Sequence, residues 1–150
     1  MKKVLLVLVI SILSAVSVHA QSKFGISSAE YYCLTNGKSN TNVGISYSFL
    51  KLNVDWFDLD IGHTIMGESV GLFIPQYRKE SFSLIPEIAL GMANGKFEND
   101  ESSVRFQSQL GMCLKYDFKS GLSSGICLKY TNIQDCDIMW SLGICLAINL

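Results

Sequence analysis

The amino-acid sequence predicts an all-β protein: an eight-stranded antiparallel up-and-down transmembrane β-barrel, a meander that follows a cleaved signal peptide. Three observations predict this class. A charged and then apolar N-terminal segment indicates export. After it, apolar residues alternate with small or polar ones in segments of about ten residues. Polar stretches typical of turns separate these segments, as in an antiparallel meander.

Residues 1–20 have the pattern of a signal peptide. Lys2 and Lys3 precede an apolar run over 4–18 that only serines interrupt, and Val18-His19-Ala20 resembles a small-residue cleavage site. The alternative is an uncleaved N-terminal anchor, for which this run is short. We therefore expect a barrel domain over 21–150.

The N-terminal half of that domain predicts four strands, over 23–35, 42–52, 56–66 and 69–79. In the second strand Val43, Ile45 and Tyr47 oppose glycine and serine. In the third, Phe57, Leu59 and Ile61 oppose Asp58, Asp60 and Gly62. Such alternation is the period of a strand with two different faces.

The C-terminal half predicts four more strands, over 81–94, 102–118, 121–132 and 137–150. Alternation is clearest in the last of them, where even positions are bulky and apolar and odd positions are mainly small, as in Gly143, Cys145 and Ala147. The other three follow the same parity, with a disturbance at Pro86. Polar connections at 94–101 and 132–137 separate them.

The composition of the two strand faces indicates whether the barrel lies in water or in lipid. A soluble barrel fills its interior with the apolar face and shows a solvated polar face outside. Here the second face is mainly Gly, Ser, Ala and Cys, which suits the crowded axis of a narrow barrel. We therefore expect the apolar face to lie against lipid. Aromatic residues near the predicted short-turn ends favour an interfacial girdle: Trp56, Phe57, Phe82, Tyr116 and Phe118.

The whole mature pattern resembles the small outer-membrane β-barrels of Gram-negative bacteria, the OmpA/OmpX-like or porin-family domain. The style of the signal peptide and the short loops look similar to Bacteroidota-type members. The resemblance implies insertion into the outer membrane of the cell envelope, with contacts to outer-membrane lipid and lipopolysaccharide. It also implies assembly by the barrel-assembly machinery, as a monomer. Members usually end in an aromatic residue, whereas this chain ends in Leu150.

An eight-stranded barrel is filled by its own side chains, so charged residues on the inward face must be paired. We expect a structural ion-pair network that plugs the lumen; the alternative is a proton or ion pathway. A hairpin centred near Lys96 would place Glu87 opposite Arg105. The members of the predicted network are Asp58, Asp60, Glu87, Arg105, Lys115, Asp117 and Lys129.

The chain has five cysteines, all after the signal peptide, and an odd number cannot pair fully within a monomer. A turn about Ser120 would place Cys113 opposite Cys127, and a turn about Cys136 would place Cys127 opposite Cys145. Cross-strand disulfides are possible in an oxidising compartment, but we expect free, packed thiols.

No catalytic constellation stands out. Lipid A-modifying enzymes and proteases occur among small outer-membrane barrels, and their chemistry needs an activated histidine. His63 is the only histidine after the signal peptide, and Lys129-Tyr130-Thr131-Asn132 occupies the place of a deacylase motif without its histidine. No cysteine pair has zinc spacing. We expect no catalysis, no metal and no cofactor.

The composition argues against some classes of binding partner. The formal net charge is −1, with 17% charged and 49% hydrophobic residues, and no block of like charge. That balance argues against nucleic acid. The expected function is a non-enzymatic outer-membrane barrel with a structural or surface-contact role. The alternatives are a soluble periplasmic or secreted barrel that binds a lipid-like ligand, and a lipid A-modifying enzyme.

Overall fold

A computed structural model describes residues 24–58, 64–73, 77–97, 102–118 and 120–149. Among these residues no helix is long and apolar enough to cross a membrane. Among the described residues there are nine strands: eight have nine residues or more and one has three residues. They are β1 (Phe24–Cys33), β2 (Ser39–Tyr47), β3 (Leu50–Asp58), β4 (Thr64–Phe73), β5 (Tyr77–Lys79), β6 (Phe82–Lys96), β7 (Ser102–Asp117), β8 (Leu122–Ile133) and β9 (Met139–Asn149).

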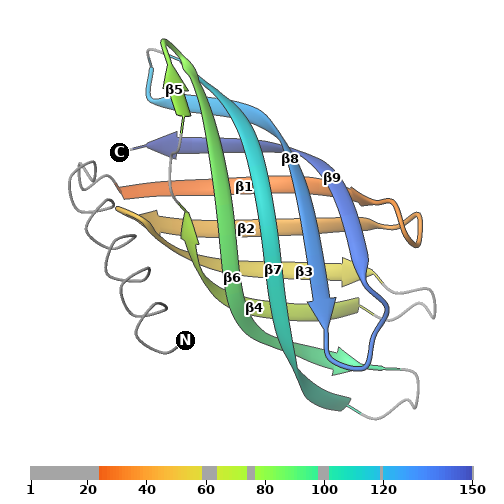
Figure 1. The fold of residues 1–150 in the computed structure, drawn as a ribbon. Coiled ribbons are helices and arrows are strands. Elements are labelled where there is room, and N and C mark those ends of the chain that lie inside the picture. The colour runs from red at the N-terminus through yellow and green to blue at the C-terminus, as the bar shows by residue number, and fades with distance from the viewer. Residues whose placement is uncertain (1–23, 59–63, 74–76, 98–101, 119, 150) are drawn as a thin grey trace, which may run out of the picture.

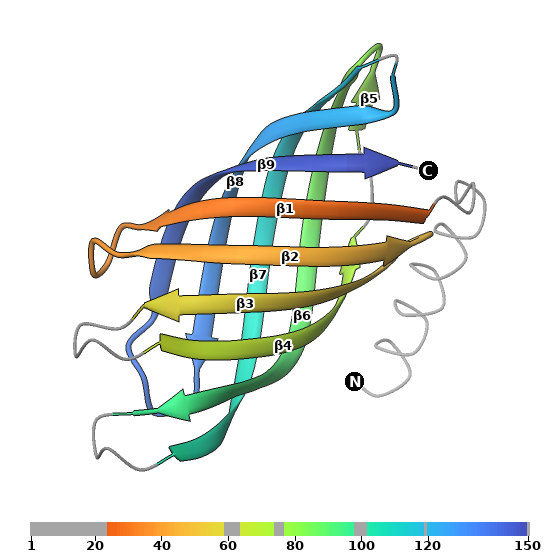
Figure 2. The same ribbon diagram turned by 180° about the vertical axis from the view of Figure 1, so that it is seen from behind.

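The strands form a closed antiparallel barrel in chain order (Figures 1 and 2). Two seams close it. β1 pairs with β9 from Gly25↔Asn149 onward, and β4 pairs with β6. Short β5 pairs with the beginning of β6, on the side where β4 pairs further along, so β4 and β5 together occupy one position in the ring. The barrel is therefore eight-stranded, as the sequence predicts.

Short turns and longer connections lie at opposite ends. Two-residue links join β2 to β3 and β5 to β6, and Ser48 and Glu80 in them have φ of 58° and 54°. Gly121, at φ 82°, precedes β8 at the same end, where Asn149 N donates to its carbonyl oxygen. Residues 34–38 and 134–138 make longer loops at the other end.

The bulky face of the sheet points outward. In the last four long strands the even-numbered apolar residues are mostly exposed, up to 67% for Ile144, while Cys127, Met139 and Ala147 on the odd positions are buried. The predicted parity of these strands is confirmed. Val43, Ile45, Tyr47, Val70 and Leu72 also face outward as predicted.

The predicted third strand was wrong in both position and parity. Prediction placed a strand over 56–66, whereas β3 ends at Asp58 and β4 begins at Thr64. Phe57 is 2% exposed and points inward, and Asp58 is exposed. The cause is the tight turn at Ser48-Phe49, which has no glycine, proline or asparagine to indicate it and which the predicted strand 42–52 runs straight through.

Outward aromatic residues gather near both ends. At the short-turn end the Tyr116 ring packs edge-on against Phe82 and Phe118, with centroids 5.0 Å apart in each pair. At the loop end Tyr130 packs edge-on against Trp140 at 5.1 Å. Trp56 is outward but lies near the loop end of β3, and Phe57 is inside, so these two do not belong to the short-turn group where we predicted them.

Inside, the loop end of the barrel is closed by apolar side chains. They come from the ends of six strands and pack into one buried cluster: Cys33, Phe57, Ile65, Ala93, Phe97, Ile133 and Met139. The middle of the lumen is more polar, with buried Asn42, Asp55 and Gln109. The polar side chains that could form a functional site therefore lie in the middle of the lumen, away from the loop end.

Glycine keeps the β4–β6 seam closed. A Cβ on Gly91 would meet the Cα of Ser69, its register partner, at 2.6 Å. We predict that Gly91→Ala lowers the free energy of unfolding by about 1–3 kcal/mol, since overpacking forces the backbones apart. Urea titration of the folded, heat-modifiable gel band measures this.

Gly111→Ala is the matched control on neighbouring β7. Its added Cβ would lie 3.6 Å from the nearest atom, the Cβ of Glu87, which is ordinary contact. We expect this variant to stay within about 1 kcal/mol of the parent. Equal midpoints for the two variants would contradict the seam argument.

A candidate charge network in the barrel lumen

Asp55 is the centre of the lumenal network. Its side chain projects inward from β3 and the residue is 1% exposed. Asn42 Nδ2 donates to its Oδ1 at 2.8 Å and Gln109 Nε2 donates to its Oδ2 at 2.8 Å. Lys129 Nζ forms a salt bridge with Oδ1. Both carboxylate oxygens are thus satisfied, as a buried charge requires.

Glu87 forms a second centre from β6. Lys51 Nζ lies 3.0 Å from its Oε2 and Asn53 Nδ2 donates to its Oε1 at 2.9 Å. Lys51 and Asn53 stand on β3, on the inward face that also carries Asp55. Because the inward residues of one strand are two apart, β3 serves both centres.

The network joins opposite walls of the barrel. Asp55 of β3 is held by Lys129 of β8 and Gln109 of β7, strands that do not pair with β3. Such contacts across the axis need a lumen no wider than two side chains, which an eight-stranded barrel provides. The network therefore ties the two halves of the barrel together through its interior.

Aromatic rings contact the buried cation. The Lys129 ammonium lies 5.2 Å from the centroid of the Tyr31 ring and 6.0 Å from that of Phe57, within cation–π range. A cavity of about 10 Å³ remains beside these groups, which is about the space of one water. At this level the lumen is packed by side chains.

The seven predicted network residues do not all lie in the lumenal network. Glu87 and Lys129 are in the network, although in separate ion pairs. Lys115 and Asp117 are half-buried on the inward face of β7, toward the short-turn end. Asp58 points outward, where Thr64 Oγ1 donates to its Oδ1 at 3.1 Å. Asp60 lies outside the described residues.

Arg105 does not face Glu87. The register pairs Glu87 with Gly111 and Arg105 with Ala93, because the β6–β7 hairpin extends beyond the turn assumed near Lys96. Arg105 instead binds the loop end. Its guanidinium lies 3.9 Å above the Phe97 ring and donates to the carbonyl oxygens of Gln134 and Asp135 at 3.2 and 3.1 Å.

Sequence reasoning missed five members of the network: Asp55, Lys51, Asn53, Asn42 and Gln109. The missed turn at Ser48-Phe49 hid the three that β3 carries. Lys51 fell within the predicted strand 42–52, and Asn53 and Asp55 fell between that strand and the predicted strand 56–66. One signal was present, since Lys51, Asn53 and Asp55 alternate with Leu50, Leu52 and Val54. That alternation indicates a strand with its polar face inward.

The structure confirms some of the predictions for the cysteines and contradicts others. Cys113 and Cys127 are register partners, as predicted, but they form a disulfide in place of the expected free thiols. Cys145 is a buried free thiol and pairs in register with Gly125, so it does not lie directly opposite Cys127. Cys33 is also a buried free thiol. His63 lies outside the described residues.

Comparison with known proteins supports the architecture alone. No family model and no curated protein matches the chain. Among solved structures, the N-terminal β-barrel domain of Pseudomonas aeruginosa OprF gives a TM-score of 0.59 at 13% identity, covering 88% of this chain and 100% of that chain. Neisserial surface protein A gives 0.53 at 8% identity, with coverage of 84% and 94%. The outer membrane enzyme PagL gives 0.52 at 14% identity, with coverage of 83% and 98%.

Removing the Asp55 charge should destabilise the barrel strongly. Asp55→Asn keeps the shape but leaves Lys129 buried without its counter-charge. We predict a loss of about 3–5 kcal/mol in the free energy of unfolding, measured by urea titration in detergent micelles. Asp58→Asn is the control, and because its carboxylate is exposed we expect a change within about 0.5 kcal/mol. A larger effect at Asp58 than at Asp55 would refute the assignment.

Proposed function

We propose that this protein is an integral barrel of the bacterial outer membrane, with a lumen filled by side chains and a structural or surface-contact role without catalysis. The apolar exterior is the observation that carries this proposal. Exposed large hydrophobic residues occur on every long strand, from Ile26 on β1 to Ile148 on β9. A monomer in water rarely exposes so continuous an apolar surface.

The exterior also has the layout of a membrane barrel. An apolar band lies between aromatic groups at the two ends, Phe82, Tyr116 and Phe118 at one and Tyr130 and Trp140 at the other. Aromatic side chains of this kind favour the membrane–water interface. A soluble barrel that holds a lipid-like ligand would need the apolar face inside, which is the reverse of the observed arrangement.

The packed lumen favours a structural role over transport. Ion pairs from three strands cross the interior, and the apolar cluster around Phe57 and Ile133 closes the loop end. A conducting pathway needs a row of hydrated sites, whereas here the carboxylates are bonded to lysines and amides. The network therefore supports the plug in preference to the proton or ion pathway.

The absence of catalysis is part of the proposal. The two histidines of the sequence, His19 and His63, lie outside the described residues. The carboxylates Asp55 and Glu87 are already bonded to lysines inside the barrel, away from its lipid-facing surface. PagL, described as an outer membrane enzyme, shares the fold at 14% identity, and a fold hosts many functions.

The proposed partners follow from the location. Outer-membrane lipid and lipopolysaccharide would cover the apolar band, and the barrel-assembly machinery would insert the chain as a monomer. The described loops at the apolar-cluster end, 34–38 and 134–138, are mainly polar and mostly exposed. Because outer-membrane barrels have their shorter turns in the periplasm, these loops would be the surface that contacts the exterior.

Cell fractionation tests the location. We predict that the protein is recovered with the outer membrane and that the unheated sample migrates differently from the boiled sample on a gel. Recovery in the periplasmic extract without heat-modifiable migration would refute the membrane barrel.

Two further measurements test the role. Purified protein in a planar bilayer should give no stable conductance steps, because the lumen is packed. The lipid A mass profile should be the same with and without expression of the protein. A modified lipid A species that depends on the protein would replace the structural role with an enzymatic one.

A further inference from the structure

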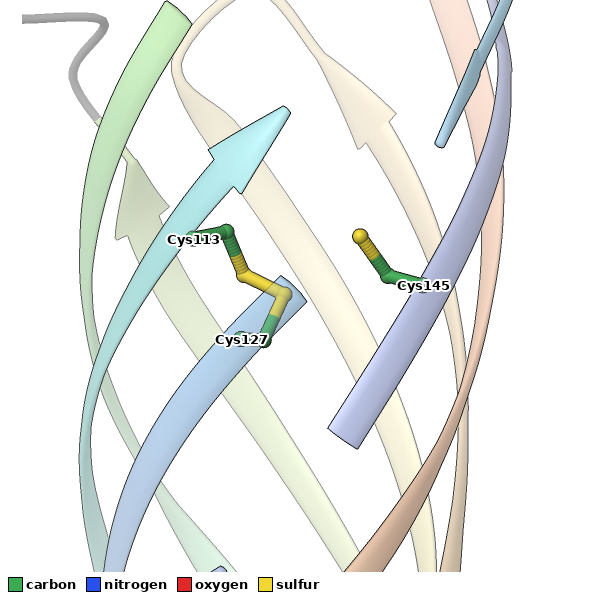
Figure 3. Close-up of side chains that lie close together, drawn as sticks. All are labelled: Cys113, Cys127 and Cys145. Carbon is green, nitrogen blue, oxygen red and sulfur yellow. A yellow bond between two sulfur atoms is a disulfide. The ribbon is translucent and has the colours of Figure 1, made fainter. Parts of the chain in front are cut away.

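Three cysteine sulfurs gather at one place in the lumen (Figure 3). Cys113 and Cys127 are joined by a disulfide, and the free Cys145 thiol belongs to the same group. The three Sγ atoms all lie within 4.8 Å of one another. A thiol at this distance from a disulfide is the arrangement from which exchange begins.

The sheet register explains why three strands can bring their sulfurs together. Cys113, Cys127 and Gly143 form one row across β7, β8 and β9. Lys115, Gly125 and Cys145 form the next inward row. Because each row has a glycine, the Cys145 side chain meets no bulky neighbour on β8, and the disulfide meets none on β9.

Two of the three cysteines are buried, and Cys113 is partly buried. Cys127 and Cys145 are 1% and 4% exposed and pack with Ala29 and Tyr31 of β1. The Tyr31 ring occupies the space above Gly143.

We propose that Cys113, Cys127 and Cys145 form one thiol–disulfide exchange site, in which the disulfide moves between the β7–β8 pair and the β8–β9 pair. The Cys145 thiolate attacks Sγ of Cys127, forming the Cys127–Cys145 bond as the Cys113–Cys127 bond breaks. The electron pair leaves on Cys113, which takes up the proton that Cys145 lost. The step is intramolecular and consumes no oxidant or reductant.

The exchange gives the barrel two covalent states. Cys127 is the shared partner because β8 lies between β7 and β9. One state links the strands of the β7–β8 hairpin, and the other links β8 to β9, the strand of the β1–β9 seam. This inference goes beyond the structural role and would hold for the folded barrel whatever its loops contact.

A soft metal ion is the competing use of three cysteine ligands. The disulfide argues against it, because two of the three sulfurs are bonded to each other and only Cys145 is available as a thiolate. Metal binding would require the reduced protein. The experiment below separates the two uses.

Differential alkylation of the full chain tests the proposal. Disulfide exchange in the folded, detergent-solubilised protein is quenched with acid, and the protein is denatured before its free thiols are blocked. The disulfides are then reduced, and the new thiols receive a second label. A Cys136→Ser background is used because Cys136 and Cys145 share the tryptic peptide 130–150. Cys113 and Cys127 fall in the separate peptides 106–115 and 120–129.

Exchange predicts that Cys127 carries the second label fully, while Cys113 and Cys145 share it. Adding Cys113→Ser should shift Cys145 to the disulfide-bonded form, with loss of its free thiol. Adding Cys145→Ser should leave Cys113 and Cys127 fully paired. Heat-modifiable migration shows that each variant is folded, and Cys33→Ser is a control outside the group that should change nothing.

Two results would overturn the proposal. The first is a folded Cys113→Ser variant in which Cys127 and Cys145 both stay free under conditions that pair Cys113 with Cys127 in the Cys145→Ser variant. The second concerns metal: reduced protein that binds one Cu(I) through all three cysteines, with no pairing of Cys145 after reoxidation, would assign the group to metal binding. Neither result bears on membrane location, so the proposed function is tested separately.

Discussion

Closure of the backbone hydrogen-bond ring is the constraint on which this structure depends. In hydrocarbon an unpaired strand edge has no water to bond, so a membrane sheet must close. Here the ring closes at two seams, β1 with β9 and β4 with β6. With eight positions the ring is narrow, and its interior must be filled by side chains that fit around the axis. Gly91 and Gly143 let neighbouring strands approach closely, because an added Cβ would meet the backbone of β4 at Gly91 and of β1 at Gly143.

The same narrowness gives the buried charges their partners. Asp55 and Lys129 are on strands that share no backbone hydrogen bonds, yet their side chains meet across the axis. In a wider barrel each would need water or an ion instead. A buried ion pair is weak evidence for net stability, because desolvation opposes the attraction. Its stronger effect is on specificity, since an altered register would leave Asp55 without Lys129.

Features set by contacts between residues close in the sequence could be predicted from it, and features set by contacts between distant residues could not. The Cys113↔Cys127 register followed from the turn at Ser120-Gly121, which the sequence makes recognisable. The turn at Ser48-Phe49 has no such signal, so the strand after it was predicted out of place and Asp55 was missed. The Asp55–Lys129 pair spans 74 positions. Its two strands are not neighbours, so no hairpin rule connects them; only the closed ring does.

Two kinds of cross-link therefore act in different directions, one around the circumference of the barrel and one across its interior. Hydrogen bonds and the Cys113–Cys127 disulfide join neighbouring strands around the circumference. The Asp55 and Glu87 centres join β3 to distant walls through the interior. Because the ion pairs hold the lumen independently of the disulfide, moving a covalent bond from one pair of strands to the next need not open the ring. A redistributable disulfide is therefore compatible with a rigid, packed barrel, since a separate set of contacts maintains its shape.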